Sequence, residues 1–422
     1  MEYTVSKEGD KKVEKDMSII VNELKKIPKV ISIILTGGFG RGEGPIKKIK
    51  NKIALYNDYD VQVVSEIAMD KEKVDRLSEE ISKKLGFSGI INFYPFVKER
   101  QKIKDNFYLD LKFYTLKELK ELLPRIRTYE FRNDSTILYG KDIRKLIPNY
   151  SLKKISLSEG IKFVLDRMSH LIEYYSLEKN HDEEFVTYSI CQAYSAMCTA
   201  LLLLSKKYEI GYKKSSEIFL KNYKKDFPEL YLQIPNLGKK IEEYVQWRLN
   251  SEKKEIKNLD EEWRTAGKSI IEVAKYLLSK FLDKKIETLE ELSDSIFEMK
   301  EKFYSPYVKE ILKNKIGFEN RLLVKFLTPF VSLILKYKFY QRLKKKKMQG
   351  LKIFFSKSPD MTIYASAPYI LGAILEKNKI DKQILKKGQE IFKKIYPTKS
   401  KEWEEISVEY ANAYISFFLQ KI

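Results

Sequence analysis

The chain has 422 residues, and its apolar fraction of 43% is high enough to form hydrophobic cores and too high for a disordered chain. Only two cysteines and two histidines are present, which argues against a disulfide scaffold and a histidine-rich metal site. The formal net charge of +21 favours partners that carry negative charge. At roughly 150 residues per domain, the length suggests two or three domains.

The positive charge is concentrated toward the end of the sequence. Residues 1–150 contain 30 basic and 23 acidic side chains, residues 151–300 contain 25 of each, and residues 301–422 contain 25 basic and 11 acidic ones. Within 301–357, 15 basic residues face 3 acidic ones. This region would attract phosphates, an RNA or an anionic membrane. The alternative is a lysine-rich surface that is simply solvated.

The N-terminus is polar and has no signal-peptide pattern, and no uncharged apolar run reaches the ~20 residues of a membrane span. We therefore expect no transmembrane segment and a cytoplasmic location. Cys191 and Cys198 are seven residues apart in an apolar stretch, so they share one helical face and are expected to be buried thiols.

Apolar spacing predicts an α+β fold, in which a small mixed-sheet domain is followed by a largely α-helical C-terminal region. The elements predicted in the first domain, residues 1–150, are a helix over 11–27, a buried strand over 30–35, a glycine-rich loop over 36–44, a strand over 59–64, a helix over 71–85, strands over 89–97 and 107–114, a short helix over 116–123, and a return to the domain edge at 137–140.

After Leu152 the apolar spacing is helical throughout. We predict a helical bundle domain over 151–300, with helices over 161–175, 185–206, 216–225, 239–249 and 261–282, and a basic helical region over 301–422. The 185–206 helix is the most apolar and is expected to be central. His170 and the three tryptophans, Trp247, Trp263 and Trp403, are interpreted as packing residues.

One apolar segment, Phe326–Leu335, runs directly into a cluster of basic residues. We favour a core helix with a solvated basic end. Two alternatives remain open, namely a helix that lies on an anionic membrane and a surface that binds nucleic acid, for which Tyr337, Phe339 and Tyr340 interleave with the basic residues.

Three features of the first domain indicate chemistry. Gly37 and Gly38 open a glycine-rich stretch directly after a buried strand, where backbone N–H groups can approach a phosphate. Asp58 and Asp60 are two residues apart in a strand, so both carboxylates project to the same side and favour a bound cation such as Mg²⁺. Asp110 is a lone charge among apolar residues of a later strand.

The order of these features resembles the DNA polymerase β-like nucleotidyltransferase superfamily, over about residues 28–145. The resemblance implies that residues 1–150 form the catalytic domain and that Gly37 and Gly38 hold a nucleoside triphosphate. It also implies that Asp58 and Asp60 bind metal, and that Asp110 binds metal and helps to activate the attacking hydroxyl. Arg41 resembles the arginine of the Gly-Gly-x-x-Arg variant and would pair with phosphate oxygens.

The chain departs from the family pattern in two ways. Gly38 replaces the serine that many members have, and the insert over 39–57 is longer than usual and contains the cluster Lys47, Lys48, Lys50 and Lys52. These lysines are expected in a solvated loop, with phosphate or RNA contact as the alternative. Glu43 has no metal-binding role in the family, but it is placed to position Arg41.

The resemblance implies a two-ion Mg²⁺ site at which a nucleoside monophosphate, most often AMP from ATP or otherwise from another nucleoside triphosphate, moves to a hydroxyl acceptor with release of pyrophosphate. The acceptor could be a small molecule, a protein or an RNA end. The alternative is a catalytically silent nucleotide- or RNA-binding regulator on the same fold. A peripheral membrane protein that uses residues 326–347 is a third possibility.

Overall fold

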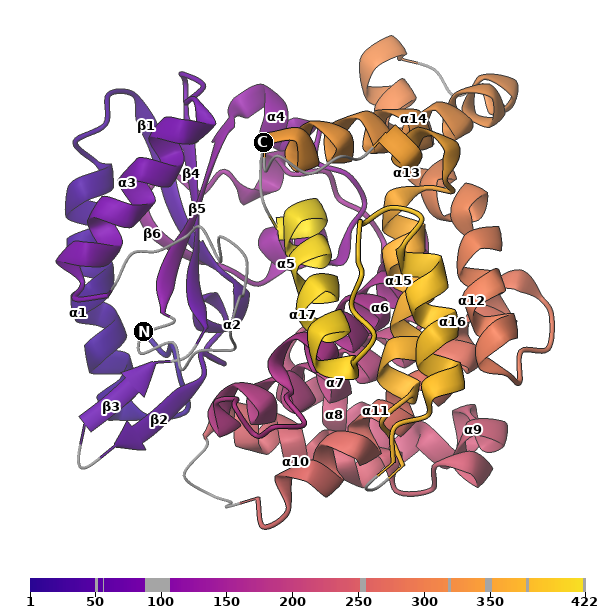
Figure 1. Cartoon of the computed structure of the whole chain (residues 1–422). Coiled ribbons are helices and arrows are strands. Elements are labelled where there is room, and N and C mark those ends of the chain that lie inside the picture. Colours follow the sequence, from indigo (N-terminus) through magenta and orange to yellow (C-terminus); the bar gives the residue numbers. More distant parts are fainter. Residues whose placement is uncertain are drawn as a thin grey trace.

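A computed structural model describes residues 1–49, 52–55, 57–87, 107–250, 256–317, 320–345, 351–376 and 379–419. Its N-terminal part contains a four-stranded mixed sheet, and helices follow, so the predicted α+β class is confirmed (Figure 1). The strand order is β5–β4–β1–β6, with bounds β1 Val30–Thr36, β4 Asp58–Ser65, β5 Tyr108–Thr115 and β6 Thr136–Gly140. Strands β4 and β5 are parallel, whereas β1 pairs antiparallel with both β4 and β6.

Successive side chains of a strand point to opposite faces of the sheet, so each face packs into a separate hydrophobic core. On one face, Tyr59, Val61 and Leu109 pack with the helices α1 (Lys7–Leu24) and α3 (Lys71–Lys84). These two helices cover that face (Figure 1). On the other face a smaller core forms with α4 (Leu116–Lys120) and α5 (Ile126–Asn133). The polar positions of β4 therefore face away from α1 and α3, toward the helical part of the chain.

Several predictions for residues 1–150 need correction. The stretch over 36–44 begins with a one-turn helix, α2 (Gly37–Gly40), rather than a loop throughout. The expected loop in the insert contains a hairpin, β2 (Ile46–Ile49) with β3 (Lys52–Leu55), and α5 was missed. The strand predicted over 89–97 lies outside the described residues. The other predicted strands and helices of this domain are confirmed to within a few residues.

The rest of the chain is helical, and the five predicted helices correspond to α6, α7, α8, α10 and α11. The bounds are α6 Leu157–Tyr174, α7 Glu183–Leu204, α8 Tyr212–Asp226, α9 Pro228–Gln233, α10 Leu237–Leu249, α11 Leu259–Leu282, α12 Leu289–Glu298, α13 Lys300–Ile316, α14 Arg321–Lys345, α15 Pro359–Gly372, α16 Lys382–Phe392 and α17 Trp403–Tyr414, with the short turns η1 Arg144–Leu146, η2 Leu152–Lys154, η4 Leu351–Phe355 and η5 Ile415–Leu419.

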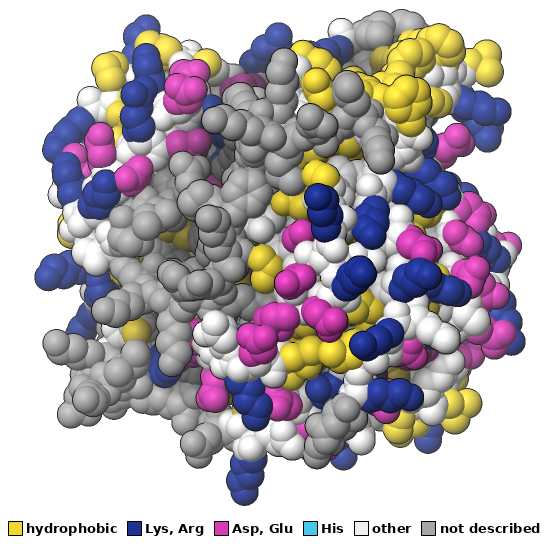
Figure 2. Space-filling model, in the orientation of Figure 1, with side chains coloured by type: hydrophobic (Ala, Val, Ile, Leu, Met, Phe, Trp, Pro, Cys, Tyr) yellow, Lys and Arg dark blue, Asp and Glu magenta, His cyan; other side chains and the backbone are white. Residues whose placement is uncertain are grey.

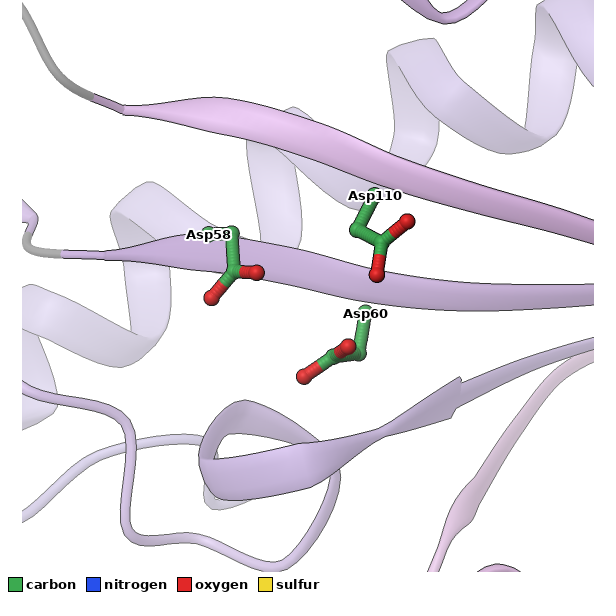
Figure 3. A group of neighbouring side chains, drawn as sticks. All are labelled: Asp58, Asp60 and Asp110. Carbon is green, nitrogen blue, oxygen red and sulfur yellow. The ribbon is translucent and has the colours of Figure 1, made fainter. Parts of the chain in front are cut away.

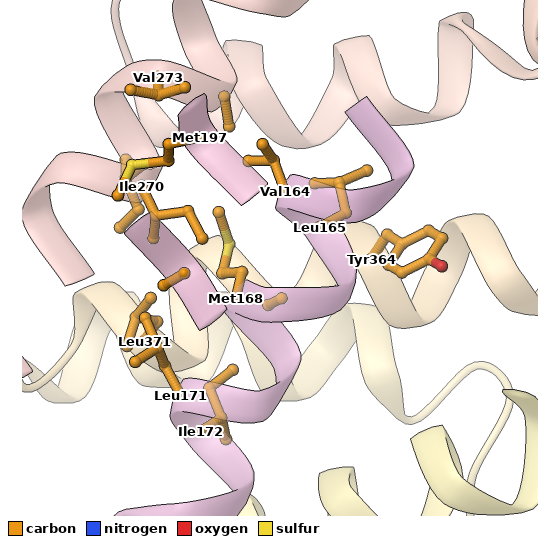
Figure 4. Packing of buried hydrophobic residues seen from close by; sticks show 14 of the residues in the cluster. Val164, Leu165, Met168, Leu171, Ile172, Met197, Ile270, Val273, Tyr364 and Leu371 are labelled. Atoms are coloured by element: carbon orange, nitrogen blue, oxygen red, sulfur yellow. The ribbon is translucent and has the colours of Figure 1, made fainter. Parts of the chain in front are cut away.

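One apolar cluster joins these helices. Side chains of α6 such as Leu165 and Met168 pack against Met197 of α7, Ile270 of α11 and Leu371 of α15 (Figure 4). The cluster contains residues from both sides of position 300. The division into domains at 150 and 300 stays a prediction.

Helix α7 lies at the centre of the helical part, as its composition predicts. It contacts α6, α8, α10 and α11. Among the described residues it is the one helix long and apolar enough to cross a membrane by length and composition. However, 89% of its most apolar window is buried inside the protein, which is typical of a core helix. Its two cysteines, Cys191 and Cys198, are free and buried, as predicted.

The tryptophans and His170 also occupy the packing roles predicted for them. Trp263 and Trp403 are fully buried, and their indole N–H groups donate to the carbonyls of Leu171 and Ile370. Trp247 packs on the edge of the same cluster. His170 is enclosed, and burial followed by the charge of the neighbouring arginine lowers its pKa to about 3.

The prediction of a core helix over 326–335 was wrong for most of its apolar residues. In α14 one face packs inward through Val324, Thr328 and Phe339. The opposite face exposes large apolar side chains, among them Phe326 and Ile334. The run of apolar residues does not reveal which of them meet a neighbouring helix.

Candidate functional site

Three carboxylates meet at one end of the parallel strand pair. Asp58 and Asp60 lie on β4, and Asp110 lies on β5 directly opposite Asp60 in the strand register. Figure 3 shows the three side chains turned toward the same space. Carboxylate oxygens of all three lie within 4.8 Å of one another, close enough to hold a metal ion together. The structure therefore brings together the three acids that the sequence analysis singled out.

The chain that leads into β4 fixes the direction of the first carboxylate. Asn57 has a positive φ of 75°, a conformation that asparagine tolerates better than most residues. The Asn57 side-chain amide donates a hydrogen bond to Asp58. Tyr108, opposite Asp58 in the register, donates to the same carboxylate. Asp58 is thus oriented by two neighbours before any cation is considered.

The electrostatics of the group favour an added positive charge. Burial raises the pKa of Asp58 well above its ordinary value, and the nearby carboxylates of Asp60 and Asp110 raise it further. Burial also raises the pKa of Asp60, although Lys112 partly offsets the effect. A proton or a cation relieves this repulsion. Hard oxygen ligands of this type suit Mg²⁺, so the residues present fit the metal that the sequence implied.

Two cationic side chains border the carboxylates, and the sequence analysis did not identify either of them. Lys112 follows Asp110 by two residues on β5, and its Nζ lies 2.6 Å from Asp110 Oδ2. Arg127 comes from α5, and the charges of Asp60 and Asp110 outweigh its burial, so that its pKa stays above the ordinary value. The period-two spacing of Asp110 and Lys112 could have revealed the first cation. No spacing signal connects Arg127 to the strands.

Gly37 lies directly against the carboxylates. It has a positive φ of 68°, and a Cβ atom at this position would lie 2.3 Å from Asp60 Oδ2. Both the backbone conformation and the close approach therefore require glycine. Gly38 is also confined, since its Cβ would lie 3.0 Å from the carbonyl oxygen of Glu43. Of the two predicted nucleotide-binding glycines, Gly37 thus lies at the edge of the acidic group, and Gly38 packs against the backbone of the same loop.

Arg41 and Glu43 connect this loop to the helical part of the chain. Arg41 Nε donates to Glu43 Oε2 at 3.1 Å, which confirms that Glu43 positions Arg41. Glu43 in turn accepts the backbone N–H groups of Tyr212 and Lys213 at the start of α8. The guanidinium of Arg41 also lies over the Tyr212 ring, 4.6 Å from its centroid. Burial lowers the pKa of Arg41, but nearby acidic groups outweigh this, and the pKa is raised.

The lysine cluster of the insert lies only partly within the described residues. Lys47 on β2 forms an ion pair with Glu184 of α7 instead of lying in a solvated loop. Lys50 lies outside the described residues. This ion pair is a second link between the N-terminal domain and the helices.

A cavity of about 130 Å³ lies where α5 and the Arg41 loop meet helices α6, α7, α8 and α10. Four arginines line it, namely Arg41, Arg127, Arg167 and Arg248. Arg41 and Arg127 also lower the pKa of Asp60, so one end of the cavity is electrostatically coupled to the three carboxylates. The sequence analysis did not identify Arg167 and Arg248 as site residues.

Comparisons with known proteins add no assignment. No family model matches the chain, and no curated protein sequence matches it. The functional interpretation therefore depends on the side chains described above.

We expect Asp58→Asn to stabilise the metal-free protein at neutral pH. The pKa of Asp58 is raised above 3.8, so the folded state holds a proton that the unfolded state has lost, and wild-type stability falls as the pH rises from about 4 through the raised pKa. The amide removes this loss, on the order of 1 kcal/mol in the free energy of unfolding. Urea denaturation of both proteins in EDTA at several pH values measures the difference in the free energy of unfolding. A variant that is less stable than wild type at neutral pH contradicts the prediction.

We expect Gly37→Ala to weaken divalent-cation binding at least tenfold, because the added methyl group displaces the Asp60 carboxylate. Gly86→Ala is the matched control, since Gly86 also has a positive φ (87°) but no atom of the described residues lies within 4 Å of its Cβ position. Both variants should lose on the order of 1 kcal/mol of stability. Calorimetric titration with Mn²⁺ measures the affinities. Equal affinities in the two variants would show that the contact with Asp60 is unimportant.

Proposed function

We propose that the protein is a Mg²⁺-dependent nucleotidyltransferase that moves a nucleoside monophosphate, most often AMP from ATP, to a hydroxyl group of an acceptor. The single observation that supports this proposal best is the convergence of Asp58, Asp60 and Asp110 within 4.8 Å, with Gly37 packed against them. In the reaction an acceptor oxygen bonds to the α-phosphorus, the bond from that phosphorus to the bridging oxygen breaks, and pyrophosphate leaves. The hydroxyl proton passes to a base or to solvent.

Each group of the site has a role in this proposal. Asp58, Asp60 and Asp110 would hold the cations, which supply neutralisation of the charge that develops on the phosphates. Asp110 would also accept a hydrogen bond from the attacking hydroxyl. The backbone N–H groups at Gly37 and Gly38 would approach the triphosphate beside the carboxylates. Arg127 and Arg41 place positive charge next to the same space.

One observation favours the alternative, a catalytically silent nucleotide- or RNA-binding regulator. Lys112 already forms an ion pair with Asp110, so an internal cation neutralises part of the acidic group. A retained site that binds nucleotide without transferring it would also keep the three carboxylates. Only a transfer assay separates the two functions.

The experiment is an incubation of the purified protein with Mg²⁺, a cell extract and each of the four nucleoside triphosphates, labelled at either the α- or the γ-phosphate. We expect label in the acceptor from the α-labelled nucleotide and not from the γ-labelled one. Asp58→Asn and Asp60→Asn should reduce transfer at least a hundredfold, since they remove charge from the site where neutralisation is needed. Asp142→Asn, which alters an exposed carboxylate paired with Arg144, should leave transfer unchanged.

Transfer of the γ-label would indicate a kinase instead. Nucleotide binding without any transfer would support the silent regulator.

A further inference from the structure

The residues that line the cavity described above include four guanidinium groups and one carboxylate, Glu130. Four of the twelve arginines in the chain line it, and no lysine does. The carboxylates near Arg41 are Glu43 and Glu130, at 3.1 and 3.4 Å. Glu43 also accepts two backbone N–H groups of α8, and Glu130 also accepts from Tyr208. These two acids therefore offset only part of the arginine charge.

The arginines are held in place, yet two of their buried donor atoms make no hydrogen bond to the described residues. Arg248 is 8% exposed, lies between the rings of Tyr188 and Tyr212, and donates to the Tyr212 hydroxyl at 3.1 Å. Its Nε atom is buried without a hydrogen-bond acceptor among the described residues, and the buried Nη1 atom of Arg41 has only the ion-pair contact with Glu130 Oε2 at 3.4 Å. Buried donors of this kind are costly to leave unpaired. An anion in the cavity would satisfy them.

The guanidinium of Arg167 is oriented by uncharged side chains rather than by a carboxylate. Its Nη1 atom lies 2.7 Å from His170 Nδ1 and 3.2 Å from Gln192 Oε1. The pKa of His170 is lowered to about 3, so the ring is neutral at physiological pH and orients the guanidinium without adding charge. Arg167 therefore reaches the cavity without a hydrogen bond to a carboxylate of the described residues.

We propose that this cavity binds an anionic group of the acceptor, of the size of a phosphate, and that Arg167 and Arg248 are its specific ligands. The inference rests on the proposed function, because it is the acceptor that the helical part would present to the carboxylates. A volume of about 130 Å³ accommodates one such group. Arg127, which lines the cavity and lowers the pKa of Asp60, would lie between this group and the reaction centre. The acceptor is thus a phosphorylated, or similarly anionic, hydroxyl compound.

The test uses inorganic phosphate as the probe, with the full chain in EDTA and without nucleotide. We expect calorimetry to detect phosphate binding that falls tenfold or more in Arg167→Gln and Arg248→Gln, because each loses charge-assisted hydrogen bonds. Arg248→Lys, which keeps the charge, should retain part of the affinity, and Arg264→Gln is the control outside the cavity. Absence of phosphate binding in the wild type overturns the proposal.

A second titration, with Mg²⁺ and a non-hydrolysable ATP analogue, separates the two sources of a phosphate group. We expect Arg167→Gln and Arg248→Gln to bind the analogue as the wild type does. An equal loss of analogue binding would mean that the cavity receives the nucleotide's own terminal phosphates, which overturns the acceptor assignment. If the wild type fails to bind the analogue but binds phosphate, the proposed function fails while the anion site stands.

A separate surface carries a second inference. Along α14 large apolar side chains recur at three- and four-residue steps on the solvent side, namely Leu322, Phe326, Phe330, Leu333, Ile334 and Tyr337, with exposures between 45% and 79%. We call this row the apolar stripe. Phe355 of η4 is 93% exposed, and the adjacent Phe354 contacts the Tyr340 ring of α14. Figure 2 shows hydrophobic side chains gathered in this region, at the upper right.

The charge of α14 indicates the kind of partner that would cover the apolar stripe. Residues 321–345 contain seven basic residues and no acidic one, and Lys325 and Lys338 are exposed beside the stripe. A second copy of the chain packed here would bring these positive charges together. An RNA would leave the aliphatic side chains Leu333 and Ile334 without a partner. Anionic lipid supplies both an apolar layer and negative charge.

We infer that α14 lies on the surface of a membrane that contains anionic lipid. The test is co-sedimentation of the full chain with phosphatidylcholine vesicles, with and without about one-third phosphatidylglycerol. We expect binding to the anionic vesicles that weakens as salt is raised. The double variant Leu333→Glu with Ile334→Glu should lose at least tenfold in affinity, because it places carboxylates in the apolar layer. Leu232→Glu, at an apolar residue that is 83% exposed at the end of α9, is the control.

Equal sedimentation of the double variant and the wild type, or no sedimentation of the wild type, overturns this inference. A wild-type dimer that the double variant converts to monomer, without any vesicle binding, would assign the stripe to a second copy instead. Binding of RNA by the wild type that the double variant loses would assign it to nucleic acid.

Discussion

The repulsion among three carboxylates on two parallel strands is the interaction on which the site depends. The strands are held in register by residues that alternate with the acids, such as Tyr59, Val61 and Leu109, all fully buried against α1 and α3. The acids therefore have no freedom to separate without disturbing that core. The hydrophobic core thus maintains an arrangement that is electrostatically unfavourable until a cation or a proton is present. Such an arrangement is typical of a functional site rather than of a structural ion pair.

The loop after β1 transmits this constraint to the helices. Gly37 contacts Asp60 at the start of the loop, and six residues later Glu43 accepts two N–H groups at the start of α8. One end of this short loop therefore contacts the carboxylates, and the other end is hydrogen-bonded to α8. Arg41, between them, pairs with Glu43 and lies over Tyr212. The position of the helical part relative to the carboxylates is consequently set by the same residues that line the site.

The sequence predicted those features that depend on spacing along one segment. Period two placed Asp58 and Asp60 on one face, and the burial of β1, β4 and β5 follows from their β-branched and aromatic residues. The convergence of Asp110 with this pair required the family resemblance, because strand order does not follow from periodicity. Arg127 was missed because α5 has eight residues and little amphipathic pattern. Arg167 and Arg248 are 81 residues apart in the sequence, and the packing of both α6 and α10 against α7 brings them to one cavity.

The basic residues of the cavity and of α14 differ in kind, because arginine lines the cavity whereas five of the seven basic residues of α14 are lysines. Arginine is more weakly hydrated than lysine and offers several donors in a fixed plane, so its burial in a cavity costs less and its donors match an oxyanion. The cavity accordingly contains four arginines and no lysine among its lining residues. On α14 the exposed charges beside the apolar stripe include Lys325 and Lys338, whose long flexible side chains suit a diffuse negative surface better than a single ligand. The net charge of +21 therefore does not by itself indicate a nucleic-acid partner. The ligand that a basic residue suits depends on whether the residue lines the buried cavity or lies on the exposed surface of α14.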